Sequence, residues 1–123
     1  MMRKSLLWMA LLLLITTPTL AQTKTKQRVA SDAQRLASLL QDVQNKSNVS
    51  EAAWRTIANE ANALSNRLYG YTSGNKTARA SASSLRTHVR AMRTSALKGN
   101  ADDARKHASE ALPFTYRLID WAT

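Results

Sequence analysis

The sequence predicts an all-α protein, an antiparallel up-down-up-down four-helix bundle that follows a cleaved signal peptide. Four segments carry apolar residues at alternating steps of three and four, which is the spacing of one face of a helix. Short polar connections separate these segments, and short connections favour antiparallel neighbours. No segment alternates apolar and polar residues as a half-buried β-strand does.

The N-terminus has the features of a secretory signal peptide. Met1–Lys4 is positively charged, and the apolar run Leu6–Ile15 is shorter than the ~20 residues that a transmembrane helix needs. Ala21 then provides a small residue at a suitable cleavage position. We therefore expect residues 1–21 to be removed, and residues 22–123 to be exported to the periplasm or the extracellular space as one domain.

The first helix of the bundle is predicted from Val29 to about Gln44 or Lys46. Its apolar seam is Val29, Ala33, Leu36, Leu40 and Val43. Residues 22–28 are polar and basic and lack this periodicity, so we expect them to be frayed or loosely helical.

The second helix is predicted to begin after a short polar connection, where Asn48 or Ser50 can cap its first turn. Its apolar seam is Trp54, Ile57, Ala61, Leu64, Leu68 and Tyr71. Gly70 and Gly74 follow, and either could take the left-handed conformation that often ends a helix. We expect Gly74 to be the one that does so.

The third helix is predicted between Asn75, which caps its start, and Gly99, which ends it. Its apolar seam is Ala78, Ala82, Leu85, Val89, Met92 and Ala96. The alternating steps of four and three predict a helix that packs one face into the core of a bundle.

The fourth helix is predicted to begin at Asn100, with Asp102 and Asp103 complementing the helix dipole in its first turn. Its seam is Ala101, Ala104, Ala108, Ala111, Thr115, Leu118 and Ala122. Pro113 removes the backbone hydrogen bond to the Ser109 carbonyl, so we expect a kink there.

The composition limits the functions that the chain can have. It contains 18 Lys and Arg residues against 8 Asp and Glu, a net charge of +10, and loss of Arg3 and Lys4 with the signal peptide would lower this to about +8. Such a charge favours an anionic partner, which could be an acidic protein, a polysaccharide, a lipid surface or nucleic acid. The absence of cysteine excludes disulfides, thiolate metal sites and covalent haem attachment.

The segment Asn75–Lys98 concentrates this positive charge, with six Lys or Arg residues and no Asp or Glu. Its four arginines fall in a stripe about 60° wide, roughly 90° from the centre of the apolar seam. These are Arg79, Arg86, Arg90 and Arg93. We predict that they form an exposed basic ridge for an anionic partner; the alternative is that Asp or Glu residues of a neighbouring helix neutralise them.

A second hypothesis is a small-ligand carrier. Met92 and His107 lie about equally far from the turn at Gly99–Asn100, and His88 is one turn from Met92. A methionine and a histidine that face each other across a bundle can ligate haem iron. Met92 and His107, with His88 as a further candidate, could therefore hold haem or a metal ion, although the basic-ridge hypothesis requires no cofactor.

Motifs of common catalytic sites are absent from the sequence. No Gly-x-Ser-x-Gly elbow or Gly-rich phosphate loop occurs, and a capped first turn explains the adjacent carboxylates Asp102 and Asp103. We therefore expect a small exported binding or accessory protein rather than an enzyme.

Overall fold

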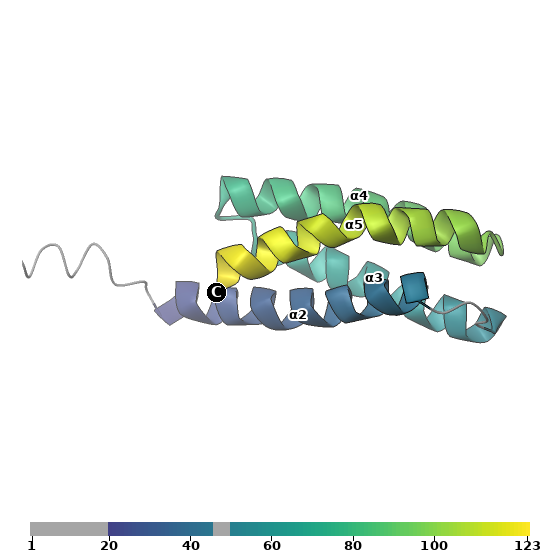
Figure 1. Cartoon of the computed structure of the whole chain (residues 1–123). Coiled ribbons are helices and arrows are strands. Elements are labelled where there is room, and N and C mark those ends of the chain that lie inside the picture. The colour runs from purple at the N-terminus through teal and green to yellow at the C-terminus, as the bar shows by residue number, and fades with distance from the viewer. Residues whose placement is uncertain (1–19, 46–49) are drawn as a thin grey trace, which may run out of the picture.

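The computed structural model describes residues 20–45 and 50–123, and all regular secondary structure in these ranges is α-helical. The helices are α2 (Leu20–Asn45), α3 (Glu51–Tyr71), α4 (Lys76–Leu97) and α5 (Ala101–Ala122). They lie side by side along one long axis (Figure 1). The prediction of an all-α protein with four helices is therefore confirmed. Of the predicted signal peptide, residues 1–19 lie outside the described ranges.

Each helix packs against two others, which closes a ring around a shared core. Both α2 and α4 contact α3 and α5. The C-terminal half of α5 descends from α4 towards α2, while α3 lies behind (Figure 1).

No helix in the described part of the chain has a stretch long and apolar enough to span a bilayer.

The predicted apolar seams form the core. Leu40, Leu64, Leu85 and Leu118, one from each helix, are at most 4% exposed. All six seam residues predicted for α4 are buried. The many alanines of the seams allow the helix axes to approach closely, and the larger Leu, Val and Met side chains fill the layers between them.

The buried face of α3 differs slightly from the predicted one. Ile57 and Tyr71 are only half-buried, whereas Ala58 and Ser65 are buried. The small side chains lie at the centre of the face because they allow close helix contact, and the larger ones lie at its flank. The Ser65 hydroxyl donates a hydrogen bond to the Asn62 carbonyl (2.9 Å), so its burial leaves no unsatisfied donor.

Three predicted N-caps are confirmed. Each cap side chain accepts a hydrogen bond from the backbone N–H three residues later, which satisfies one of the free donors of the first turn. The pairs are Ser50 with Ala53 (3.2 Å), Asn75 with Ala78 (2.9 Å) and Asn100 with Asp103 (3.2 Å). Of the two candidates for the cap of α3, the structure selects Ser50.

The two predicted glycine terminators have different outcomes. Gly99 has a φ of 76° and follows α4, as predicted. The prediction for Gly74 is wrong, because Gly99 is the only described residue with a positive φ. Thr72 ends α3 instead, and its buried hydroxyl donates to the Leu68 carbonyl (2.9 Å). A side-chain donor thus takes over the role expected of glycine.

The segment expected to be frayed or loosely helical, residues 22–28, belongs to a regular helix. Helix α2 begins at Leu20, so residues 22–28 form regular turns rather than a frayed start. Within these turns the Lys26 ammonium lies 5.1 Å from the centre of the Trp121 ring, a contact that ties the start of α2 to the end of α5. Helix α5 is continuous through Pro113, whose side chain is exposed, and the expected kink at this residue stays a prediction.

Candidate functional site

Three of the four arginines of α4 lie against α3, and they follow a strict repeat. Arg79, Arg86 and Arg93 are seven residues apart, so they lie on one helix face at intervals of about 10.5 Å. We call these three the arginine row. All three are half-buried, whereas Arg90 beside them is exposed. The predicted ridge therefore has an outer member and a row that packs against the neighbouring helix.

Tyr69 of α3 holds two members of the arginine row. The guanidinium carbon of Arg79 lies 4.0 Å from the centre of the Tyr69 ring, and that of Arg86 lies 3.7 Å from it. Both distances allow a favourable cation–π contact. Hydrogen bonding and charge from Arg79, followed by the charge of Arg86, lower the pKa of the Tyr69 phenol below its ordinary value. Tyr69 therefore contacts both arginines through an aromatic ring and a phenol, not through a carboxylate.

Arg93, the third member of the arginine row, also has a neutral partner. Its Nε donates a hydrogen bond to Oδ1 of Asn59 on α3 (3.0 Å). Within residues 20–45 and 50–123, no ion pair joins Arg79, Arg86, Arg90 or Arg93 to a carboxylate. The alternative prediction, neutralisation by Asp or Glu of a neighbouring helix, therefore has no support in this part of the chain.

On the opposite side of α3, two arginines are paired with carboxylates between α2 and α3. Arg35 of α2 makes two hydrogen bonds to Glu60 (2.9 and 3.3 Å), and Arg67 of α3 makes two to Asp32 (3.0 and 2.9 Å). These two-pronged pairs balance charge between α2 and α3. Between α3 and α4 a tyrosine and an asparagine take the places of the carboxylates, so no described carboxylate pairs with the arginine row.

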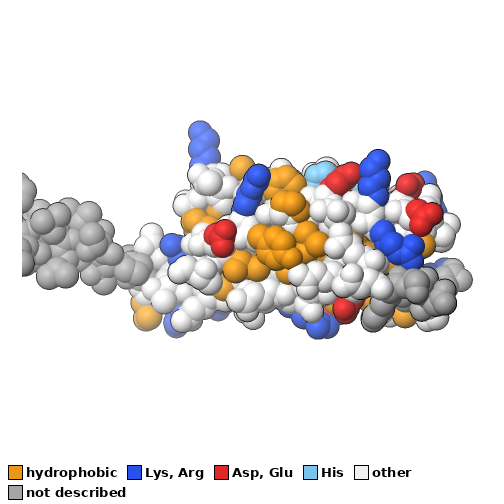
Figure 2. Space-filling model, in the orientation of Figure 1, with side chains coloured by type: hydrophobic (Ala, Val, Ile, Leu, Met, Phe, Trp, Pro, Cys, Tyr) orange, Lys and Arg blue, Asp and Glu red, His pale blue; other side chains and the backbone are white. Residues whose placement is uncertain are grey.

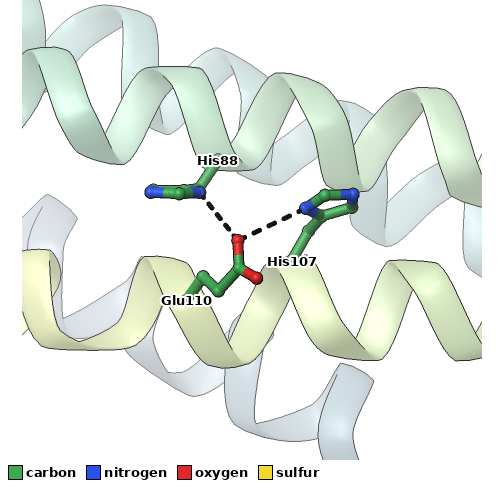
Figure 3. Close-up of side chains that lie close together, drawn as sticks. All are labelled: His88, His107 and Glu110. Atoms are coloured by element: carbon green, nitrogen blue, oxygen red, sulfur yellow. Dashed lines mark ion pairs between the residues drawn. The ribbon is translucent and has the colours of Figure 1, made fainter.

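A second cluster lies between α4 and α5, where two histidines converge on one carboxylate oxygen (Figure 3). His88 comes from α4, and His107 and Glu110 come from neighbouring turns of α5. Nδ1 of His88 lies 3.2 Å from Oε2 of Glu110, and Nδ1 of His107 lies 3.6 Å from the same oxygen. We call these three residues the histidine cluster.

The histidine cluster only partly matches the predicted ligand set. It contains His88 and His107, whereas Met92 is buried in the core seam of α4. Equal distance from the turn places Met92 and His107 at one level, but it does not place their side chains on one face. A hollow of about 410 Å³ lies at the end of the bundle where α2 begins, and its lining includes neither histidine nor Met92.

Sequence reasoning missed Tyr69, Asn59 and Glu110. A signal for Glu110 was present, because Glu110 and His88 are each 11 residues from Gly99 and must therefore lie at similar levels on α4 and α5. Tyr69 is not part of the apolar seam predicted for the second helix. Its contact with Arg79 and Arg86 depends on which faces of α3 and α4 meet, and apolar spacing alone does not determine that.

The face formed by α4, α5 and α2 has a different character from the arginine row. Figure 2 shows hydrophobic side chains gathered over α5, with Lys, Arg, Asp and Glu side chains around them. Tyr116 of α5 is 44% exposed, and its hydroxyl accepts a hydrogen bond from Gln41 of α2 (2.8 Å).

Comparison of the chain with protein-family models, curated proteins and solved structures finds no match.

Proposed function

We propose that this chain is a small exported binding protein, without enzymatic activity, that recognises an anionic partner through the face formed by α3 and α4. The observation that carries this proposal is the arginine row with its neutral partners, Tyr69 and Asn59. Arg35 and Arg67, by contrast, are each paired with a carboxylate.

The contacts of the arginine row leave its binding capacity largely intact. A guanidinium has five N–H donors, and the contacts of Arg79 and Arg86 with Tyr69 engage only the ring and the single hydroxyl group of that tyrosine. Arg79 and Arg86 therefore keep donors for the oxygens of a carboxylate, phosphate or sulfate group. Because Tyr69 restricts their motion, less side-chain entropy is lost when an anion binds.

The length of the row indicates the kind of anion. Arg79 and Arg93 are 14 residues apart, which is about 21 Å along the axis of α4. A single small anion cannot contact all three members, whereas a polymer or a charged surface can. The proposed partner is therefore an extended polyanion, and Arg90 would contribute at the exposed edge.

The topology and the export of the chain belong to the same proposal. We propose an antiparallel up-down-up-down order, supported by the contacts of Arg35 with Glu60 and of Asp32 with Arg67, which advance along α2 while they retreat along α3. Removal of residues 1–21 would leave the arginine row intact, since α4 begins at Lys76.

The test compares two triple variants that remove the same charge. One changes Arg79, Arg86 and Arg93 to Gln; the other changes the exposed residues Lys24, Arg28 and Lys106 of α2 and α5 to Gln. Heparin, single-stranded DNA and vesicles containing an anionic lipid serve as probes, and binding is measured between 50 and 200 mM salt, a range over which multi-contact polyanion binding weakens strongly.

We expect the arginine-row variant to bind more weakly and with a flatter salt dependence than the control, because fewer anionic groups are contacted. Circular dichroism at the assay temperature verifies that both variants are folded. Equal weakening of the two variants would show that net charge alone attracts polyanions, and the proposal would then be wrong. The probe with the largest difference identifies the class of partner.

A further inference from the structure

We propose that the histidine cluster, His88, His107 and Glu110, is a binding site for a divalent first-row transition cation such as Zn²⁺. The cluster lies between α4 and α5, whereas the arginine row faces α3, so this proposal does not depend on the proposed function. Its ligands differ from those expected from the sequence, because the carboxylate of Glu110 replaces the sulfur of Met92.

The donor set is one that such cations prefer. Two imidazole nitrogens and one carboxylate oxygen bind Zn²⁺ in many proteins and leave a coordination position open for water or another ligand. The cluster offers His88, His107 and Glu110, with one ligand atom from each. Ca²⁺ and Mg²⁺ favour sites made only of oxygen ligands, so they are poor candidates for this cluster.

The spacing of the donor atoms is close to that of a coordination shell. Ligand atoms 2.0–2.2 Å from a tetrahedral ion are about 3.3 Å from one another. The two Nδ1-to-Oε2 distances are 3.2 and 3.6 Å, and all three donor atoms lie within 4.8 Å of one another. The two imidazoles would therefore have to approach each other by at most about 1.5 Å, which small side-chain rotations can provide.

One of the donor atoms has no hydrogen-bond partner in the described part of the chain. This atom is Nδ1 of His107, which is buried and lies 3.6 Å from Glu110, too far for a hydrogen bond. Buried polar atoms without partners are rare, because they lose hydration without compensation. The atom points towards Glu110, where a bound cation would accept its lone pair (Figure 3).

The surroundings hold the ligands in place. His107 and Glu110 are one turn apart on α5, so the helix itself fixes their separation. The His88 ring stacks on Phe114, with 5.6 Å between the ring centres and 13° between the planes, which restricts its rotation. Only His88 is supplied by a second helix, and the turn at Gly99 connects that helix directly to α5. Because these side chains are already restricted, they lose less conformational entropy when a cation binds.

The composition makes the test unusually clean, because His88 and His107 are the only histidines of the chain and no cysteine is present. Calorimetric titration of the purified, untagged chain with Zn²⁺ should give one saturable site per chain. The absorption spectrum of the Co²⁺-loaded chain should show bands characteristic of nitrogen and oxygen ligands in the inner shell. Bound cation should also raise the thermal midpoint with its concentration.

The variants are His88→Gln, His107→Gln and Glu110→Gln, and the matched control is Glu60→Gln, whose side chain is equally exposed (40%). Loss of an outer-shell partner alone weakens metal binding 10–100-fold, so loss of a direct ligand should cost at least that. We expect each of the three variants to bind Zn²⁺ at least tenfold more weakly and the control to bind as the parent does. All variants should keep the parental circular dichroism spectrum and heparin affinity.

Any of four results would overturn the proposal. The first three are no saturable binding of Zn²⁺ or Co²⁺ by the parent, unchanged affinity in a double variant of His88 and His107, and equal weakening in the Glu60→Gln control. Unchanged affinity in Glu110→Gln alone would remove the carboxylate from the ligand set and so overturn the site as described.

Discussion

Replacement of Leu85 by Ala tests the orientation of α4, on which the position of the arginine row depends. Leu85 is completely buried in the seam of α4, whereas Leu97 on the same helix is 40% exposed and lies towards the arginine side. The same substitution at the two positions removes the same atoms from two very different environments. Only the rotation of α4 about its axis decides which leucine matters.

The expected magnitudes follow from these exposures. Replacing a fully buried Leu by Ala costs about 2–5 kcal/mol, because transfer free energy is lost and a cavity remains between the packed helices. Burying a whole Leu side chain contributes about 1.5–3 kcal/mol, and Leu97 is only partly covered and borders solvent, so no closed cavity forms. We therefore expect a loss of about 1 kcal/mol or less for Leu97→Ala.

The assay is equilibrium unfolding in urea, followed by circular dichroism at 222 nm and interpreted with a two-state model. The dependence of the unfolding free energy on urea should stay the same in both variants, because it reports the surface exposed on unfolding. Equal losses at Leu85 and Leu97 would refute the reasoning. In that case α4 would be rotated, and Arg79, Arg86 and Arg93 would not face α3.

Three further predictions concern the pKa of Tyr69, the glycines Gly99 and Gly74, and the start of the exported chain. Site-resolved NMR titration should find the phenol pKa of Tyr69 below its ordinary value of 10.0, and Arg79→Gln should raise this pKa. Because the pKa is lower in the folded chain than in the unfolded chain, the contact stabilises the fold at alkaline pH. This stabilisation disappears as the pH falls through the folded pKa. Gly99→Ala should cost about 1 kcal/mol in urea unfolding because its φ is 76°, although an added Cβ would meet no neighbouring atom, whereas Gly74→Ala should be neutral or slightly stabilising. Intact mass of the exported chain should correspond to a start at Gln22, and a full-length mass would contradict the predicted cleavage.

Local chemistry explains why so much of the fold could be predicted. The seam of α4 and the caps Asn75 and Asn100 depend on residues within one or two turns of each other, so sequence spacing is sufficient. The end of α3 was mispredicted because Thr72 competes with Gly74 through a side-chain hydrogen bond whose burial only the folded chain reveals. Thr72 and Gly74 are both residues that can end a helix, and the sequence alone does not show which of them does so.

The candidate sites were harder to predict because they depend on pairs of helices. The repeat of Arg79, Arg86 and Arg93 is visible in the sequence, but their partners belong to α3, and the facing surfaces are set by the rotation of both helices. Met92 and His107 were paired by level alone. Two side chains meet only when their residues lie at the same height along the bundle and also on facing sides of their helices. Glu110 meets both conditions, because it lies one turn from His107 and at the height of His88.

The different partners of the arginines give the bundle an electrostatic polarity across its width. On one flank of α3 the carboxylates of Asp32 and Glu60 balance Arg67 and Arg35, while on the other the described partners of the arginine row are Tyr69 and Asn59. Arginine keeps its proton throughout the physiological pH range, so this asymmetry persists wherever the protein works. A molecule with such a lateral dipole rotates as it approaches a negatively charged surface, and within about 8 Å, the screening distance in physiological salt, it would turn its α3–α4 flank towards that surface before any contact forms.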